Sequence, residues 1–374
     1  MDPDNDEFWG NFFFPGLSIG AQKFWLRFEE VADQVHYISV YFNYYLSFLG
    51  VLLNIFHFII LIQKPMMTSS TNIIMIGICL CDLVMMSRIS FDYIDTRIVL
   101  SHLTSPNSAC FPPSSYFTVY LRSVFAFGSY GFKRCAVWLG VLLGGVRALV
   151  IRNPARTEFL VTLKFGLLST ISTFLLASPL PILYLLNQRI KVISSWTPGP
   201  QCTGFPPNYS EPHVTMGQDP QFYTDNFQNW LITFDSWAYR IIPSVIFPIF
   251  TVFLVIELRK AKKRQMALRK SEVSDKTTRF VLWMTITFVF AEAPQGIIAL
   301  LLILSVGYQG FINILIEVTA IFLVADTVNS IIHVFICFFM SSQYRRTVRK
   351  LLGFKEKVVQ PAWDVSSIRQ KTLS

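Results

Sequence analysis

The chain has 374 residues, of which 52% are hydrophobic and only 15% charged, and its mean hydropathy is +0.46. Soluble globular proteins carry about 25% charged residues, so the composition disfavours a soluble enzyme, and six cysteines are too few for a disulfide-stapled secreted fold. The net charge of +9 does not indicate a nucleic-acid partner, because the Lys and Arg residues cluster between apolar runs instead of forming a separate basic domain.

Seven apolar runs are long enough to cross a bilayer, whose hydrocarbon core of roughly 30 Å needs about 20 residues of helix. In chain order they are Gln34–Gln63, Pro65–Ser87, Tyr116–Ile151, Phe165–Gln188, Ile232–Leu258, Phe280 to about Ser305, and Phe311–Met340. The third run is the weakest by hydropathy because Arg122, Lys133 and Arg134 interrupt it. The sequence therefore predicts an all-α fold, a seven-transmembrane helix bundle.

Charged residues between the runs predict the orientation of the bundle. Residues 1–34 include two basic and seven acidic side chains, whereas residues 259–279 include nine basic ones and the tail after Tyr344 has eight. Basic loops stay in the cytoplasm, so we expect the N-terminus outside and the C-terminus inside. The acidic start Met1–Glu7 lacks a signal peptide, and Asn208 opens a glycosylation sequon in a loop that this topology places outside.

An amphipathic eighth helix is predicted after the last span, where apolar residues recur at helical spacing between basic ones. These apolar residues are Tyr344, Val348, Leu351, Leu352 and Phe354. Such a helix suits an anionic inner leaflet. We thus expect an extracellular N-terminus over 1–34, a receptor-like membrane domain over 35–341, and the amphipathic helix with a cytoplasmic tail over 342–374.

Ionisable residues inside the predicted spans are candidate functional residues, because each costs several kcal/mol unless it faces a partner or a cavity. The acids singled out are Asp82, Glu292 and Asp326, and the cations singled out in spans three and five are Lys133, Arg134 and Arg240. Further acids within the runs are Asp235, Glu257 and Glu317. His333 follows Asp326 by seven residues, so both lie on one helix face. Charges of both signs suggest a polar cavity within the bundle. The alternative is that they only pair to hold the helices together.

The order of short motifs along these spans resembles the rhodopsin-like G-protein-coupled receptors. Span three ends in Arg147, Ile151 and Pro154 at the spacing of the family's Asp-Arg-Tyr-x-x-Ile-x-x-Pro motif. Span six reads Phe288-x-x-x-Glu292-x-Pro294 where the family has Phe-x-x-x-Trp-x-Pro. Span seven reads Asn329-Ser330-x-x-His333-Val334-x-x-Cys337 where the family has Asn-Ser-x-x-Asn-Pro-x-x-Tyr.

The departures from those motifs resemble one subfamily, the nematode serpentine receptor class W chemoreceptors, which are similar to FMRFamide-like neuropeptide receptors. Val146 and Ala148 flank Arg147 in place of the acid and Tyr, and Met340-Ser-Ser-Gln-Tyr-Arg follows span seven. The resemblance covers nearly the whole chain apart from its termini. It implies a ligand pocket that opens outside and a cavity for a heterotrimeric G protein that opens inside.

The resemblance also implies roles for individual residues. Ligand-binding positions are Ser129, Lys133, Arg240, Glu292 and Asp326. Positions for switching and G-protein coupling are Asp82, Arg147, Ile151, Pro154, Phe288, Pro294, Asn329, His333 and Cys337. Ser129 stands where amine receptors have Asp, which disfavours an aminergic ligand, and span seven has no Lys, which excludes a retinal Schiff base. A pocket with both charge signs suits a peptide more than a purely apolar odorant. The resemblance implies no cofactor.

Two smaller sites follow from the same resemblance. Asp82, Asn329, Ser330 and His333 match positions that hold sodium in many relatives, but His333 replaces an oxygen ligand, so we predict no metal. One alternative is that Asp82 and His333 share a proton, with or without Glu292 as a third member, and the other is that His333 is neutral and hydrogen-bonded. The family's disulfide between span three and the following outer loop corresponds here to Cys110 and Cys202, with Arg122 at the usual cysteine position.

A seven-helix channel or transporter with a charged path is the alternative class. No repeat is visible between the halves of the chain, which weakens the transporter interpretation. No metal-spaced cluster, nucleophile elbow or phosphate loop predicts an enzyme. The expected partners are therefore an extracellular peptide or small chemical ligand, a heterotrimeric G protein and the lipid bilayer of the plasma membrane, without nucleic acid.

Overall fold

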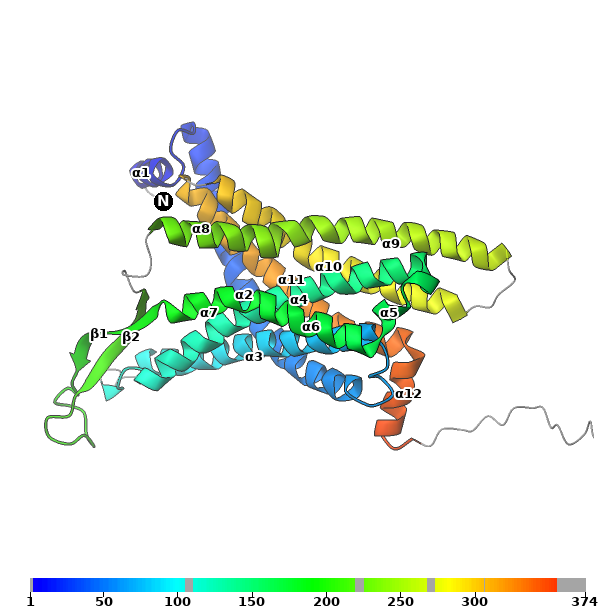
Figure 1. The fold of residues 1–374 in the computed structure, drawn as a ribbon. Coiled ribbons are helices and arrows are strands. Elements are labelled where there is room, and N and C mark those ends of the chain that lie inside the picture. Colours follow the sequence, from blue (N-terminus) through cyan, green and yellow to red (C-terminus); the bar gives the residue numbers. More distant parts are fainter. Residues whose placement is uncertain (1–2, 105–109, 219–224, 268–272, 306, 355–374) are drawn as a thin grey trace, which may run out of the picture.

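A computed structural model describes residues 3–104, 110–218, 225–267, 273–305 and 307–354. Figure 1 shows a bundle of long helices with a two-stranded hairpin at one end and a short transverse helix, α12, at the other. We call these the hairpin end and the α12 end. Seven helices in the described part of the chain are long and apolar enough to cross a membrane. The predicted all-α seven-helix bundle is therefore confirmed.

The elements follow one another as a chain of helices interrupted by one hairpin. In order they are α1 (Pro3–Phe13), α2 (Ile19–Leu61), α3 (Ser70–Thr104), α4 (Tyr116–Arg152), α5 (Glu158–Val161), α6 (Leu163–Ala177), α7 (Pro179–Leu186), β1 (Gln188–Trp196), β2 (Glu211–Gln218), α8 (Asp225–Ser236), α9 (Ile242–Ala267), α10 (Val273–Leu304), α11 (Gln309–Met340) and α12 (Ser342–Leu351). A 3₁₀ turn (Pro154–Arg156) follows α4, and a π-helical turn (Trp237–Ile241) joins α8 to α9.

The first two spanning helices are longer than their apolar runs. α2 begins at Ile19 and has 43 residues, and α3 continues to Thr104. At 1.5 Å per residue, α2 is about 65 Å long, roughly twice the thickness of the hydrocarbon core. In Figure 1, α2 crosses the bundle obliquely and packs along α11, so its length is taken up partly by its inclination.

Proline residues interrupt three of the spans. The fourth span breaks at Ser178, with α7 starting at Pro179, where a helix's first turn tolerates the missing N–H. Pro248 and Pro294 lie inside α9 and α10. Each removes one backbone hydrogen bond and favours a kink. Helices α9 and α10 therefore each contain a point at which the backbone is locally weakened.

Helix α12 is fixed to the bundle by one buried polar contact and by the end of α11. Tyr344 is fully buried, and its hydroxyl lies 2.9 Å from Nδ1 of His57 on α2. Burial raises the pKa of the Tyr344 phenol well above its usual range, so the hydroxyl stays protonated. Arg345 donates to the carbonyls of Phe338 and Phe339 at the end of α11. Leu351, Leu352 and Phe354 remain exposed, as an interfacial helix requires.

Tyr344→Phe is expected to lower the free energy of unfolding by about 1–3 kcal/mol, because a buried nitrogen of His57 then loses its partner. Thermal melting of the purified protein in detergent checks this. Tyr116→Phe is the matched control, since Tyr116 is 62% exposed. Equal melting temperatures for the two variants would contradict the stabilising role of the contact.

Candidate functional site

Four side chains from three spans meet at the centre of the bundle, and we call them the charge cluster. Lys133 Nζ on α4 donates to Glu292 Oε1 on α10 at 2.5 Å and to Asp326 Oδ2 on α11 at 2.7 Å. Gln295 Nε2 donates to the same Asp326 oxygen at 2.5 Å. Two carboxylates therefore share one ammonium group, and the cluster has a net charge of −1 when all three groups are ionised.

Close packing of α9 against α10 holds Glu292 in this position. A Cβ atom at Gly296 would lie 2.0 Å from Oγ of Ser244, so only glycine permits the approach. The Ser244 hydroxyl donates to the backbone oxygens of Arg240 and Glu292, at 2.6 Å and 3.1 Å. The carboxylate thus projects from a backbone that α9 supports, directly beside Pro294.

A cavity of about 50 Å³ lies beside the charge cluster. Its polar lining residues are Asp82, Lys133, Glu292, Asp326, Thr327, Asn329, Ser330 and His333. Three lining atoms have no hydrogen-bond partner among the described residues, namely Asp326 Oδ1, Asn329 Oδ1 and His333 Nε2. One water needs roughly 10–15 Å³ by this measure, so the cavity has room for a few water molecules or a small polar group.

A second cavity of about 10 Å³ continues toward the α12 end. Asp82 and His333 line both cavities, and His57 and Asn54 line the second. His57 in turn contacts Tyr344 of α12. Polar groups therefore follow one another through the interior of the bundle, from the charge cluster to α12.

Phe288 lies one helical turn before Glu292 on α10 and contacts three other helices. Its ring is 4.6 Å from that of Phe247 on α9 and 6.0 Å from that of His333 on α11. Gly140 on α4 faces the same ring, since a Cβ there would lie 2.5 Å from it. Two of the sequence-predicted switch residues, Phe288 and His333, are thus stacked on one another with an interplanar angle of 19°.

The remaining switch residues lie nearer the α12 end. Ile151 and the buried Cys337 pack in one apolar cluster with Tyr344 and Leu254. Arg147 is half-buried one turn before Ile151 on α4, between the buried Val146 and Ala148. Pro154 opens the 3₁₀ turn that ends the helix. The structure therefore separates the predicted residues into a central group and a group at the α12 end.

Two predicted ligand residues do not line the central cavity. Ser129 is buried and donates to the carbonyl of Ala126 at 2.7 Å, and Arg240 lies in the π-helical turn. Arg134, next to Lys133, instead pairs with Asp235 at 2.6 Å and lies 5.3 Å from the ring centre of Tyr239. The sequence identified Arg134 and Asp235 as charges within spans, but no spacing signal joined them. Gln295 was missed altogether because a neutral amide gives no such signal.

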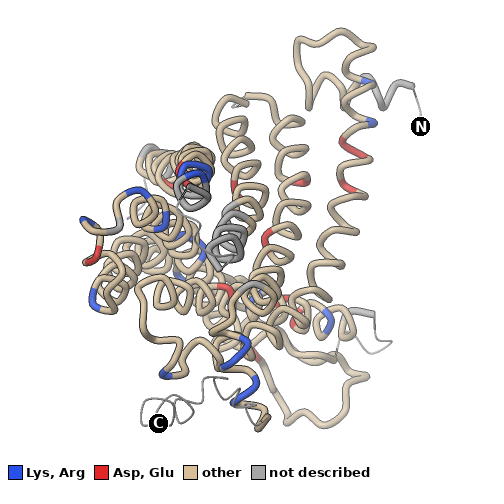
Figure 2. Tube along the Cα trace, turned by 90° about the vertical axis from the view of Figure 1, so that its right-hand side faces the viewer, with Lys and Arg blue, Asp and Glu red and all other residues tan. Residues whose placement is uncertain are grey.

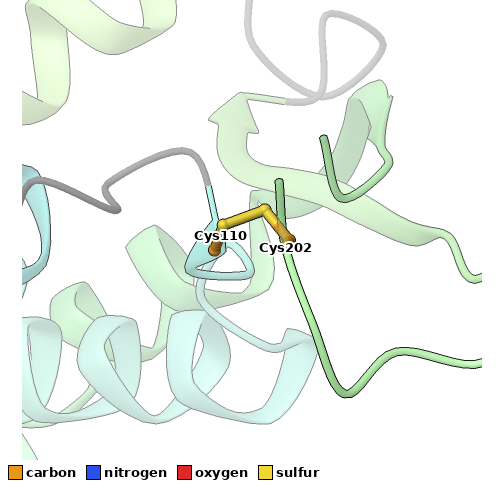
Figure 3. Close-up of a disulfide and its surroundings, with 2 residues drawn as sticks. All are labelled: Cys110 and Cys202. Carbon is orange, nitrogen blue, oxygen red and sulfur yellow. A yellow bond between two sulfur atoms is a disulfide. The ribbon is translucent and has the colours of Figure 1, made fainter. Parts of the chain in front are cut away.

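The structure contains the predicted disulfide between Cys110, just before α4, and Cys202, in the segment between β1 and β2 (Figure 3). The two Cα atoms are 5.3 Å apart. Arg122, at the usual cysteine position, pairs with Asp95 of α3 at 2.6 Å. The exposed Asn208 lies in the same β1–β2 segment with a positive φ of 60°. In the described chain, the other four cysteines have free, buried thiols.

A comparison with protein families gives one match of broad extent. The model of the serpentine type seven-transmembrane G-protein-coupled chemoreceptors, Srw, matches residues 41–355. No curated protein matches the chain. The matched range begins within α2 and ends after α12, so it includes the charge cluster, both cavities and the disulfide.

Proposed function

Since the chain belongs to the Srw family of serpentine seven-transmembrane G-protein-coupled chemoreceptors, we propose that it binds an extracellular ligand and activates a heterotrimeric G protein. It is a multi-pass membrane protein of a receptor family and not an enzyme. The observation that carries the mechanism is that Lys133 ties α4 to both α10 and α11.

The proposed orientation places the hairpin end outside the cell and the α12 end in the cytoplasm. Figure 2 looks onto the α12 end, where Lys and Arg gather along α12 and around the neighbouring helix ends. Cytoplasmic segments carry such an excess of basic residues. The disulfide at the hairpin end supports the same orientation, because disulfides persist on the oxidising side of the membrane.

The charge cluster is the proposed link between ligand and G protein. A ligand that brings its own charged group competes for Lys133 or for the carboxylates and releases α10 from α4. Pro294, two residues from Glu292, then allows α10 to pivot. Because ligand and G protein both favour the released state, each raises the affinity for the other.

A peptide is the proposed ligand class. The charge cluster contains both signs, which suits a terminal carboxylate or amide, an Arg or an acidic side chain of a peptide. An apolar odorant offers no group to replace these ion pairs. In this proposal a charged group of the ligand binds Lys133, Glu292 and Asp326, and Ser129 and Arg240 belong to the wider pocket.

A peptide-library screen in cells with a promiscuous G protein tests the function. We expect a hit that activates the wild type, and Arg147→Ala is expected to retain peptide binding and lose at least nine-tenths of the response. Arg152→Ala is the matched control, since Arg152 is exposed at the end of the same helix. A ligand-evoked current without any G protein would instead support the channel alternative.

A further inference from the structure

Helix α1 has a run of aromatic side chains that the bundle does not cover. Phe8, Trp9 and Phe12 are 64%, 43% and 60% exposed. Their rings pack on one another and on Phe13, with Trp9 and Phe13 stacked at 5.6 Å and Phe12 and Phe13 edge-on at 5.1 Å. We call these four residues the aromatic face of α1. Phe8 and Phe12 are four residues apart, and so are Trp9 and Phe13. Residues at this spacing lie on one side of a helix, so the face is continuous.

The side of α1 that faces the bundle is fixed by a buried amide. Gln22 on α2 is only 3% exposed, and its Nε2 donates to Asn11 Oδ1 at 2.9 Å and to the carbonyl of Phe14 at 3.2 Å. Gly10 lies against the same side chain, since a Cβ there would lie 3.0 Å from it. The rotation of α1 about its own axis is therefore determined by contacts, and the aromatic face points away from them.

Phe14 anchors the turn between α1 and α2. It is fully buried, and its ring centre lies 5.1 Å from Phe311 of α11 and 6.3 Å from Trp25 of α2. Gly310 makes room for it, because a Cβ at that position would come within 2.3 Å of the ring. The position of α1 relative to α2 and α11 is thus set by close packing.

This position is at the side of the bundle, at the hairpin end. Figure 1 shows α1 end-on, across the direction of the spanning helices, and Figure 2 shows the N-terminal segment at the periphery. Its contacts are with α2 and α11. Near the start of α2, the apolar residues Ile19, Phe24 and Phe28 are also exposed.

We propose that α1 is a membrane anchor whose aromatic face lies in the headgroup region of the leaflet at the hairpin end. Under the proposed orientation this is the outer leaflet. A transverse helix with exposed Phe and Trp beside a bundle fits the boundary between headgroups and acyl chains, where amphipathic aromatic side chains concentrate. Helix α12 occupies the equivalent position at the other leaflet. Both helices contact α2 and α11, α1 at the hairpin end and α12 at the opposite end.

A fluorescent probe on the full chain tests this proposal. Phe12→Cys and, separately, Trp9→Cys are labelled with an environment-sensitive dye in phosphatidylcholine nanodiscs, with the unmodified chain as background because its free thiols are buried. Leu176→Cys, 75% exposed within the fourth span, is the lipid control, and Ile193→Cys, 63% exposed on β1, is the water control. Nitroxides near the headgroup or near the chain end of the lipid act as quenchers.

We expect the dye at positions 12 and 9 to be quenched at least twofold more by the headgroup-proximal nitroxide than by the deep one. The dye at position 176 should be quenched by both, and the dye at position 193 by neither. A dye at both α1 positions that is quenched by neither nitroxide, like the dye at position 193, would overturn the proposal. Signalling is not measured, so failure of the receptor proposal leaves this outcome unaffected.

Discussion

Lys133→Met is expected to cost about 3–5 kcal/mol of folding free energy, because it leaves two buried carboxylates without their cation. The side chains of Glu292 and Asp326 are 9% and 17% exposed, so water compensates poorly for the lost ion pair. We expect little folded receptor at the cell surface and a markedly lower melting temperature. Surface labelling and thermal melting of detergent-purified protein measure both effects.

A neutral version of the same cluster separates folding from function. Lys133→Met combined with Glu292→Gln and Asp326→Asn removes all three charges while nearly preserving volume, so no unpaired buried charge remains. We expect surface expression to return and the ligand response to remain lost. The control is Lys164→Met, since Lys164 is exposed near the start of α6 and should change stability by less than about 1 kcal/mol. A Lys133→Met protein that melts like this control would refute the role of the cluster.

Loss of the Cys110–Cys202 bridge is expected to cost about 2–5 kcal/mol. The bridge joins residues separated by 92 positions, and the stabilisation by a disulfide grows with the loop that it closes. Its absence frees the hairpin from the start of α4. Cys110→Ser and Cys202→Ser should each lower the melting temperature, and the double variant should melt like either single variant.

Reductant provides the matched control for the bridge. It should lower the melting temperature of the wild type to that of the double serine variant, and leave that variant unchanged, since the other cysteines of the described chain are free. A wild type that is insensitive to reductant, with single variants of normal stability, would contradict the tethering role.

The sequence predicted the three ionisable residues of the charge cluster for one physical reason. An ionisable group within an apolar run is costly alone, so Lys133, Glu292 and Asp326 stood out before their partners were known. Their pairing could not be predicted, because it depends on the rotation of three helices. Arg134 illustrates this, since it is adjacent to Lys133 and yet pairs with Asp235 on a different helix.

The parts of the fold that were hardest to predict are the extensions of the helices beyond the apolar runs and the hairpin between two of the spans. Hydropathy limits a span to its lipid-facing part, whereas α2 also includes polar residues that are good helix formers, such as Lys23, Arg27 and Glu29, and α3 continues to Thr104. The β1–β2 hairpin was not predicted. The two strands are paired from Gln188 opposite Gln218 to Trp196 opposite Glu211, and a long segment connects them. No two-residue turn motif identifies such a hairpin in sequence.

The contact between His57 and Tyr344 also has a consequence for biosynthesis. The two residues are 287 positions apart, so at 5–20 residues per second the ribosome needs roughly 15–60 s to supply the second after the first. Throughout that interval the ring of His57 lacks the partner that it has in the folded chain. The contact can form only when α12 has been synthesised. A chain that stops before residue 344 therefore leaves His57 without this partner, a defect that quality control can recognise.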